Sequence, residues 1–362
     1  MAKKSSNLAC IWQPTPRNLA RLAAVLARGG LVAVPTETVY GLAADALNPV
    51  ACRAIFRAKG RPAADPLIVH VRTLAQADEV AVLNPAARRL AAAFWPGPLT
   101  LVLPKRVGVP AVVTAGRDSV AVRQPRHRLL QTLLRLCGRP LAAPSANPFG
   151  YISPTTAEHV RAGLGARIAH ILDGGPCVIG VESTIVDVRN PLRPVLLRPG
   201  AITRAELEKV LGRRIRLGAR PPPVAPLGAR ASRPLRPQAG EPLARPEVKA
   251  AAGLLAPGML ARHYSPRTPF TLEKKLPRPA HAVLEPRTAF LYFRRPAASP
   301  AGSKNVFWLT PDGQTAAAAH SLYSNLRALD RGGWQAIRAE RVPGTAGLAA
   351  ALNDRLARAA AR

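Results

Sequence analysis

The sequence predicts an α/β protein made of two folded units joined by an extended segment. Short apolar runs typical of buried strands recur along the first two hundred residues, with helical patterns between several of them. Between residues 213 and 250 the composition turns to Pro and Arg with hardly an aliphatic cluster, so this stretch cannot bury a core. A second set of strand and helix patterns follows. With 362 residues, of which 48% are apolar, the chain can bury two cores.

The first unit begins with an amphipathic helix over residues 18–30. It places Leu19, Leu22, Ala23 and Leu26 on one face and ends at a pair of glycines. Strands then follow wherever a short apolar run is bounded by turn residues, and we expect the unit to end near residue 212. The predicted strands are 31–36, 67–71, 99–103, 119–123, 140–145, 167–172, 183–188 and 194–199.

The second unit is smaller. Residues 256–269, at the end of the Pro-rich stretch, are too rich in Pro and Gly for a helix but dense in groups that could touch a ligand. Strands are predicted at 289–293 and 305–309, a helix around Leu322, Leu326 and Leu329, and a last helix over Leu348 to Ala360. No glycine fingerprint follows either strand, so a Rossmann-like sheet here is expected to be a scaffold or regulatory domain.

The composition limits the classes of function. A formal charge of +32 favours polyanionic partners such as nucleotides or RNA, but heavy use of Ala, Arg and Pro along the whole chain explains it equally well. The four cysteines stand far apart, which indicates neither a zinc site nor a disulfide framework. No signal-peptide core and no run of about 20 apolar residues is present, so we expect a cytoplasmic protein without a membrane span.

Four stretches carry candidate chemistry. In the first, residues 35–46, a strand ends in Thr36 and Thr38, which can hydrogen-bond a polar substrate, and Gly41 permits close backbone approach. An ordinary strand end with a capping threonine explains this stretch as well. In the second, Lys59 and Arg61 could together hold a triphosphate, the alternative being a solvated basic turn. His70, in the strand that follows, is a ligand contact or a satisfied core histidine.

The other two stretches are rich in hydroxyls and glycines. Ser145, Asn147, Ser153 and Thr155 crowd a loop before a helix start, where backbone N–H groups form a natural phosphate site. A Ser or Thr N-cap explains Ser153 or Thr155 but leaves Ser145 and Asn147 without a reason. The fourth stretch, residues 173–188, places glycines before Ser183, yet it has neither the P-loop lysine nor the dinucleotide fingerprint.

These four stretches, in this order and together with residues 94–103, 114–127 and 196–203, resemble the YrdC/Sua5 family of threonylcarbamoyl-AMP synthases. The resemblance covers nearly all of residues 15–205. Residues 256–269 are similar to the linker of the two-domain Sua5 type, and 322–330 and 347–360 resemble its C-terminal domain. It therefore implies a YrdC-like twisted sheet domain over 15–212, a linker with an active-site lid over 213–270, and a Sua5-type domain over 271–362.

The resemblance also implies a role for each site residue. It places L-threonine on Thr36, His70, Arg123 and Ser183, and gives Lys59 and Arg61 the catalytic positions. It implies a Tyr264 that reaches over the ATP site as part of a lid. Asp65 stands where the family usually has Asn, and Leu260 and Ala261 replace a common Lys and aromatic, so we expect activity with weaker nucleotide affinity. The implied ATP-binding set is Lys59, Arg61, Asp65, Thr114, Ser145, Asn147, Ser153, Arg198 and Tyr264.

The implied reaction joins L-threonine, bicarbonate or CO2, and ATP with its Mg²⁺ to give threonylcarbamoyl-AMP and pyrophosphate. The product would go to the threonylcarbamoyl transferase machinery that makes threonylcarbamoyladenosine on tRNA. No protein nucleophile and no protein-held metal is required, because displacement at phosphorus is served by positioning and by cations. A non-catalytic RNA-binding protein is the alternative. Carbamoyl transfer, as in hydrogenase-maturation proteins with a similar domain, would need paired-cysteine zinc sites that this sequence lacks. Direct tRNA binding and the oligomeric state stay open.

Overall fold

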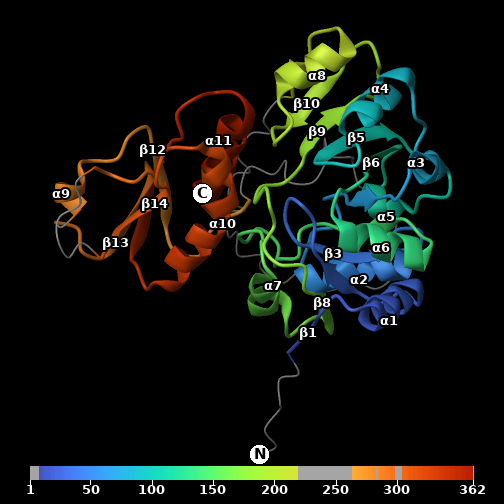
Figure 1. Ribbon diagram of the computed structural model, residues 1–362, viewed down its shortest axis with the longest axis horizontal. Helices are drawn as coiled ribbons and strands as arrows, with labels where there is room; N and C mark the ends of the chain where they lie inside the picture. Colours follow the sequence, from blue (N-terminus) through green and yellow to red (C-terminus); the bar gives the residue numbers. More distant parts are fainter. Residues whose placement is uncertain (1–7, 219–262, 283, 298–303, 362) are drawn as a thin grey trace, which may run out of the picture.

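The computed structural model describes residues 8–218, 263–282, 284–297 and 304–361. These residues form two bodies that lie side by side, each built around its own sheet (Figure 1). Most of the predicted linker, with Leu260 and Ala261, lies outside the described residues. No helix in the described ranges is long and apolar enough to cross a membrane. The predicted α/β class with a YrdC-like sheet domain and a smaller α/β domain is confirmed.

The first body holds an eleven-stranded mixed sheet in the order β1-β8-β2-β3-β7-β4-β6-β5-β9-β10-β11. Its strands are β1 (Cys10–Trp12), β2 (Val32–Val34), β3 (Gly41–Asp45), β4 (Ile68–His70), β5 (Leu99–Pro104), β6 (Ser119–Arg123), β7 (Leu141–Ala142), β8 (His170–Leu172), β9 (Thr184–Asp187), β10 (Val195–Arg198) and β11 (Arg216–Leu217). Its helices are α1 (Pro16–Ala27), α2 (Pro49–Lys59), α3 (Leu74–Val80), α4 (Pro85–Phe94), α5 (Ala111–Thr114), α6 (Arg128–Cys137), α7 (Ala157–Leu164) and α8 (Arg204–Leu211).

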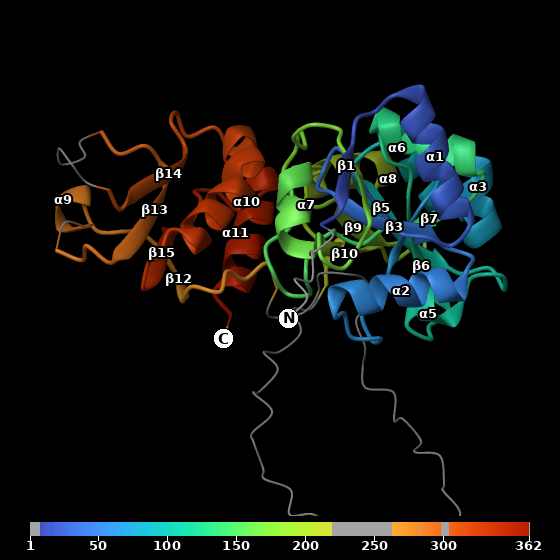
Figure 2. The same ribbon diagram turned by 90° about the horizontal axis from the view of Figure 1, so that it is seen from below.

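The second body holds four parallel strands in the order β12-β15-β13-β14. They are β12 (Phe270–Glu273), β13 (Thr288–Arg294), β14 (Val306–Thr310) and β15 (Ala336–Glu340), with helices α9 (Pro279–Ala282), α10 (Thr315–Arg331) and α11 (Gly347–Ala359). Helices α10 and α11 lie between this sheet and the first body (Figure 2). The second core is continuous across the boundary, because Val39, Ile152 and Val181 of the first body belong to the same buried cluster as Leu322 and Leu352.

The sequence patterns located most elements but missed several. The first helix begins at Pro16 rather than Asn18, because Thr15 caps it by accepting the N–H of Asn18 at 3.2 Å, and its buried face is the predicted one. All eight strands predicted in the first body are present, although in the run 140–145 only Leu141 and Ala142 form the strand, with Ser145 in an isolated bridge to Gly41. Strands β1, β3, β11, β12 and β15 were not predicted.

Two glycines permit close packing of the backbone. Gly41 starts β3, where it pairs with Val34, and a Cβ there would lie 3.2 Å from the Cβ of Ala143. The segment that follows β7 therefore packs closely against Gly41, which also lines the pocket described below. Gly180 has a φ of +84°, and a Cβ there would lie 2.3 Å from the carbonyl oxygen of Ala319 on α10. The glycine loop thus lets the second body pack closely.

Candidate active site

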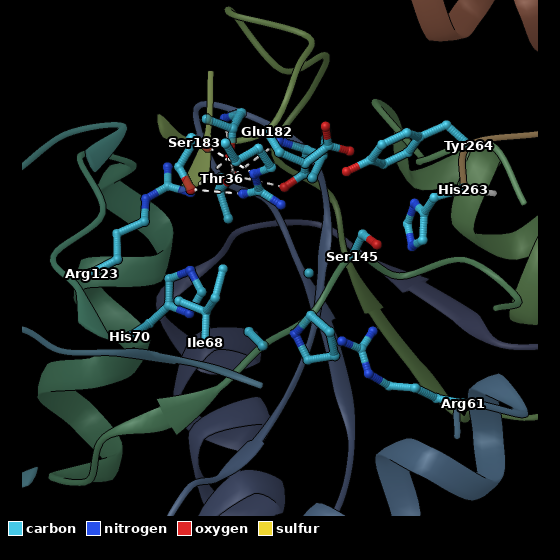
Figure 3. A pocket seen from close by; sticks show the side chains of 16 residues that line it. Thr36, Arg61, Ile68, His70, Arg123, Ser145, Glu182, Ser183, His263 and Tyr264 are labelled. Carbon is cyan, nitrogen blue, oxygen red and sulfur yellow. Dashed lines mark hydrogen bonds between the residues drawn. The ribbon is translucent and has the colours of Figure 1, made fainter. Parts of the chain in front are cut away.

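A buried pocket lies where several strand ends of the first body meet His263 and Tyr264 (Figure 3). Strands β4 and β6 end at His70 and Arg123, which are partners in parallel pairing, and β10 ends at Arg198. Ligands bind at the carboxyl ends of parallel strands, so the position matches the site expected for an open α/β sheet. The pocket is lined by Thr36, Thr38, Val39, Gly41, Arg61, Ile68, His70, Arg123, Ala143, Pro144, Ser145, Glu182, Ser183, Arg198, His263 and Tyr264.

The loop after β2 is closed by the hydroxyl of Thr36. Its Oγ1 accepts the N–H groups of Thr38 and Val39 at 3.0 and 3.1 Å and donates to the carbonyl oxygen of Val39 at 2.7 Å. Thr36 is buried. Because its hydroxyl is already used inside the loop, Thr36 shapes the pocket wall and presents Thr38, whose Oγ1 accepts a hydrogen bond from Arg123 at 3.0 Å.

Arg123 is held in place from several sides. Its Nε donates to the carbonyl oxygen of Gly97 at 3.2 Å, and its guanidinium forms an ion pair with Glu37 at 2.7 Å. Burial works to raise the pKa of Glu37, but Arg123 outweighs it and holds that pKa below its ordinary value. The cation that faces the pocket is therefore compensated before any ligand arrives, and its orientation is fixed.

His70 is neutral in this pocket. Burial, followed by the nearby Arg123, lowers its pKa to about 3. Its Nδ1 is buried and has no hydrogen-bond partner among the described residues. A neutral imidazole beside a guanidinium can hydrogen-bond an amino-acid substrate without adding charge.

On the opposite side, Arg61 follows helix α2 and enters the pocket. Its Nε donates to the carbonyl oxygen of Asp65 at 3.0 Å, and its Nη2 donates to that of Pro66 at 2.8 Å and pairs with the Asp65 carboxylate at 2.9 Å. Both side chains are almost fully buried. Burial raises the pKa of Asp65 although Arg61 opposes the rise. The acid at position 65 is thus paired with the cation that points into the pocket.

Lys59 lies behind the pocket wall and does not line it. It ends α2, and its Nζ donates to the carbonyl oxygens of Ser145 and Asn147, both at 2.5 Å. Burial, assisted by Arg61, lowers its pKa well below the ordinary value. Two of its three N–H donors hold the loop that carries Ser145, so its first action is to shape that wall.

Ser183 and Arg198 form the wall between the two sides. Arg198 donates from Nε to the carbonyl oxygen of Ser183 at 3.0 Å and from Nη2 to its Oγ at 3.1 Å. Ser183 Oγ also lies 2.8 Å from Thr100 Oγ1. The neighbouring Glu182 accepts hydrogen bonds from Ser153 at 2.7 Å and from Tyr323 of α10 at 2.9 Å.

His263 and Tyr264 cover the pocket. Their rings meet edge to face with centroids 4.1 Å apart, and both side chains are buried. Tyr264 has a φ of +62°, which is uncommon for a residue with a side chain and marks a sharply turned backbone. The hydroxyl of Tyr264 and Nδ1 of His263 have no hydrogen-bond partner among the described residues, so polar groups face the pocket unpaired.

The predicted residues divide into two layers. Thr36, Arg61, His70, Arg123, Ser145, Ser183, Arg198 and Tyr264 line the pocket, whereas Lys59, Asp65, Thr114, Asn147 and Ser153 do not. The N-cap of α7 is Thr156 and not Ser153 or Thr155, because Thr156 accepts the N–H of His159 at 3.2 Å. Ser153 is instead turned toward Glu182.

Glu37 and Glu182 were not among the predicted site residues, and neither were the second-body residues that reach Glu182, Tyr323 and Arg355. Glu37 stands inside the stretch 35–46, so its position between two threonines was a usable signal. Arg355 lies far along the chain in an Ala-rich helix, where nothing distinguishes it from the neighbouring arginines. No group of three or more His, Cys, Asp or Glu side chains in the described ranges could hold a metal ion.

Comparison with known proteins gives matches for both bodies. Residues 24–200 match the Sua5/YciO/YrdC family model, described as telomere recombination, and residues 202–361 match the model for the C-terminal domain of threonylcarbamoyl-AMP synthase. A threonylcarbamoyl-AMP synthase of Pyrococcus abyssi is 53% identical over 194 residues, 53% of this chain and 57% of that protein. One of Bacillus subtilis is 38% identical over 349 residues, 94% of this chain and 92% of that protein.

Solved structures match over the full length. The crystal structure of P. abyssi Sua5 in complex with L-threonine has a TM-score of 0.81 at 37% identity and covers 97% of this chain and 98% of that one. A variant of the same protein, with a neighbouring histidine and tyrosine both replaced by alanine, also has a TM-score of 0.81, at 36% identity, and covers 98% and 96%. With both bodies matched, the chain belongs to the two-domain Sua5 branch of the YrdC/Sua5 family.

Proposed function

We propose that this chain is an L-threonylcarbamoyladenylate synthase, which makes threonylcarbamoyl-AMP and pyrophosphate from L-threonine, bicarbonate and ATP. The observation that carries the proposal is that one buried pocket brings two groups of residues together. Arg123 and His70 stand on the side suited to an amino acid. Arg61 and Ser145 stand on the side suited to a nucleotide, with Tyr264 above them, and Ser183 and Arg198 form the wall between the two sides.

The pocket supports this chemistry through fixed charges. Bicarbonate takes up a proton and releases CO2 and water. The amine of L-threonine adds to CO2 and loses a proton, which gives a carbamate, and a carbamate oxygen then displaces pyrophosphate from the α-phosphorus of ATP. Negative charge gathers on the phosphate oxygens in that step, so cations held in advance stabilise it. Arg61 and Arg198 are buried cations whose contacts to backbone carbonyls fix their direction. Mg²⁺ enters as part of the MgATP substrate.

The buried position also suits labile species. Carbamates and mixed anhydrides of AMP react with water, and a covered site protects them. His263 and Tyr264 close this pocket, and their unpaired polar atoms are available to a bound nucleotide. We assign the pair to the ATP side because they stand near Arg61 and Ser145 (Figure 3).

The test is product formation with each substrate omitted in turn. Purified protein should release pyrophosphate from ATP only when L-threonine and bicarbonate are both present, and mass spectrometry should identify threonylcarbamoyl-AMP. The Arg61→Gln variant should lose most of this activity. Arg57→Gln, which removes an exposed cation from the last turn of α2, four residues before Arg61, is the matched control and should stay near wild type. Release that does not need L-threonine, or no release at all, would contradict the proposal.

An adenylate product needs an enzyme that consumes it, and the charge of +32 favours a polyanionic partner such as RNA. We propose that the adenylate passes to the transferase machinery that modifies tRNA. A non-catalytic RNA-binding protein remains the competing function, because the charge favours polyanions. Binding of tRNA by a protein that makes no adenylate would favour that alternative.

A further inference from the structure

Arg355 is a fully buried arginine on α11 of the second body, and three of its four hydrogen bonds go to the first body. Its Nε donates to the carboxylate of Glu182 at 2.9 Å and its Nη2 to the carbonyl oxygen of Glu182 at 3.4 Å. Its Nη1 donates to the carbonyl oxygen of Pro199 at 2.9 Å and to Asp354, on its own helix, at 3.0 Å. One guanidinium therefore joins two separate backbone segments of the first body.

These two segments are the ones that carry Ser183 and Arg198. Glu182 directly precedes Ser183, and Pro199 directly follows Arg198, so Arg355 is attached next to each pocket residue. Their strands, β9 and β10, run antiparallel with an irregularity in register between Leu196 and Arg198. Where a ladder is irregular, backbone bonds constrain the ends less, and other contacts must position them.

Glu182 depends on the second body for its charge. Its carboxylate is buried and receives hydrogen bonds from Arg355 and from Tyr323 of α10, as well as from Ser153. Burial would raise its pKa, but Arg355 and then Arg198 hold that pKa below the ordinary value. Without Arg355, an ionised carboxylate would stay in the pocket wall without the cation that directly pairs with it.

Arg355 and Tyr323 also support Tyr264. The guanidinium carbon of Arg355 lies 5.5 Å from the centre of the Tyr264 ring, and the ring of Tyr323 lies 5.7 Å from it. Arg355 therefore touches the wall and the cover of the pocket at once, although it does not line the pocket itself.

We propose that Arg355 is a positioning residue through which the second body completes the substrate pocket, by fixing Glu182 and Pro199 and with them Ser183 and Arg198. The inference rests on the proposed function for the identity of the ligands. It gives the second body a part in substrate binding beyond that of a scaffold.

Arg327 provides a matched comparison. It is also a buried arginine of the second body, on α10, and it also donates to backbone carbonyls of the first body, those of Ile152, Ser153 and His159. None of these three residues lines the pocket. Ser153 contacts the pocket residue Glu182 through its Oγ, whereas Arg327 binds the carbonyl oxygen of Ser153 and makes no hydrogen bond with Glu182 among the described residues. An arginine that only holds the two bodies together would behave like Arg327.

The experiment compares full-length Arg355→Met, Arg355→Lys and Arg327→Met with wild type. Both methionine variants should melt at lower temperature, because each leaves buried carbonyls unpaired. Only Arg355→Met should raise KM for L-threonine and for ATP, each by about tenfold or more with kcat changed far less, since ground-state contacts are lost. Arg355→Lys keeps a charge and one donor direction, so its KM values should lie between those of wild type and methionine.

Equal KM values in Arg355→Met and Arg327→Met would overturn the proposal and leave Arg355 as interface packing. If Arg355→Met does not fold, Arg355→Lys is measured in its place. KM values equal to those of wild type in Arg355→Lys would then overturn the proposal. If wild type makes no adenylate, the proposed function fails separately. In that case the Kd values for L-threonine and ATP, measured by calorimetry, replace the KM values. The inference would be overturned if the Arg355 variants bound both ligands as tightly as wild type, or if wild type bound neither.

Discussion

Replacing Thr36 by valine tests how the amino-acid side of the pocket is built. Valine keeps the branched shape and has a methyl group in place of the hydroxyl. That hydroxyl accepts two backbone N–H groups, from Thr38 and Val39, and donates to the carbonyl oxygen of Val39 at 2.7 Å. The side chain is only 3% exposed, so water has little access to the groups left behind.

The expected loss of stability follows from that count. A buried donor or acceptor left unpaired costs about 1–3 kcal/mol, and three such groups with some relaxation of the loop give about 3 kcal/mol. Serine at the same position keeps the hydroxyl and loses one methyl group, which costs about 1 kcal/mol. The difference of about 2 kcal/mol should separate the melting temperatures of the two variants by about 4–8 °C.

The functional effect should run in the same direction. The loop closed by Thr36 holds Thr38 against Arg123, so a deformed loop disturbs the wall on which we place L-threonine. We expect KM for L-threonine to rise by about tenfold or more in Thr36→Val and to stay within about threefold of wild type in Thr36→Ser.

Thermal unfolding and steady-state pyrophosphate release on both variants provide the measurements. A Thr36→Val protein that is as stable as Thr36→Ser would refute the account of the turn. A stable valine variant with a raised KM for L-threonine would show that the hydroxyl contacts the substrate itself.

Three further changes probe the rest of the pocket. Asp65→Asn should lower the Kd for ATP, measured by calorimetry, severalfold. The change removes a negative charge near the pocket, while Arg61 stays bound to two backbone carbonyl oxygens. Unchanged or weaker ATP binding would count against this account. Since Arg355 holds the pKa of Glu182 below 4.5 against the effect of burial, that ion pair stabilises the fold above this pH and is lost as pH falls further. Glu182→Gln should therefore flatten the fall in unfolding free energy below pH 4.5, and an unchanged slope would exclude the pair as its source. Tyr264→Phe should melt no lower than wild type, because the buried hydroxyl has no partner among the described residues, and should raise KM for ATP severalfold; a lower melting temperature would reveal a structural bond.

Much of the fold was predictable because it rests on local patterns. The apolar runs that form β4, β5 and β6 are short, continuous and rich in Val, Leu and Ile, which is typical of strands buried on both faces. Strand β3 escaped prediction for an equally local reason. Its sequence, GLAAD, is dominated by Gly and Ala, which have low strand propensity, and only its place between β2 and β7 makes it a strand.

The sequence predicted which residues gather at the site, but not which of them line the pocket and which lie behind its wall. Lys59 and Arg61 stand two residues apart and suggested a joint phosphate clamp, yet Gly60 adopts a left-handed conformation between them and turns the chain. Arg61 consequently enters the pocket, whereas Lys59 holds the loop of Ser145 from behind. Spacing along the sequence shows that two cations are close but does not show which one faces the ligand.

The sequence by itself determined the α/β class, the main strands and the family to which the pocket belongs, because hydrophobic periodicity and residue order are written in consecutive residues. Only the tertiary structure decided that Glu182 is held by Arg355, a residue 173 positions away. Such a pair exists because two bodies dock and exclude water around opposite charges. The energy of a buried ion pair depends on that exclusion and not on anything local to either residue.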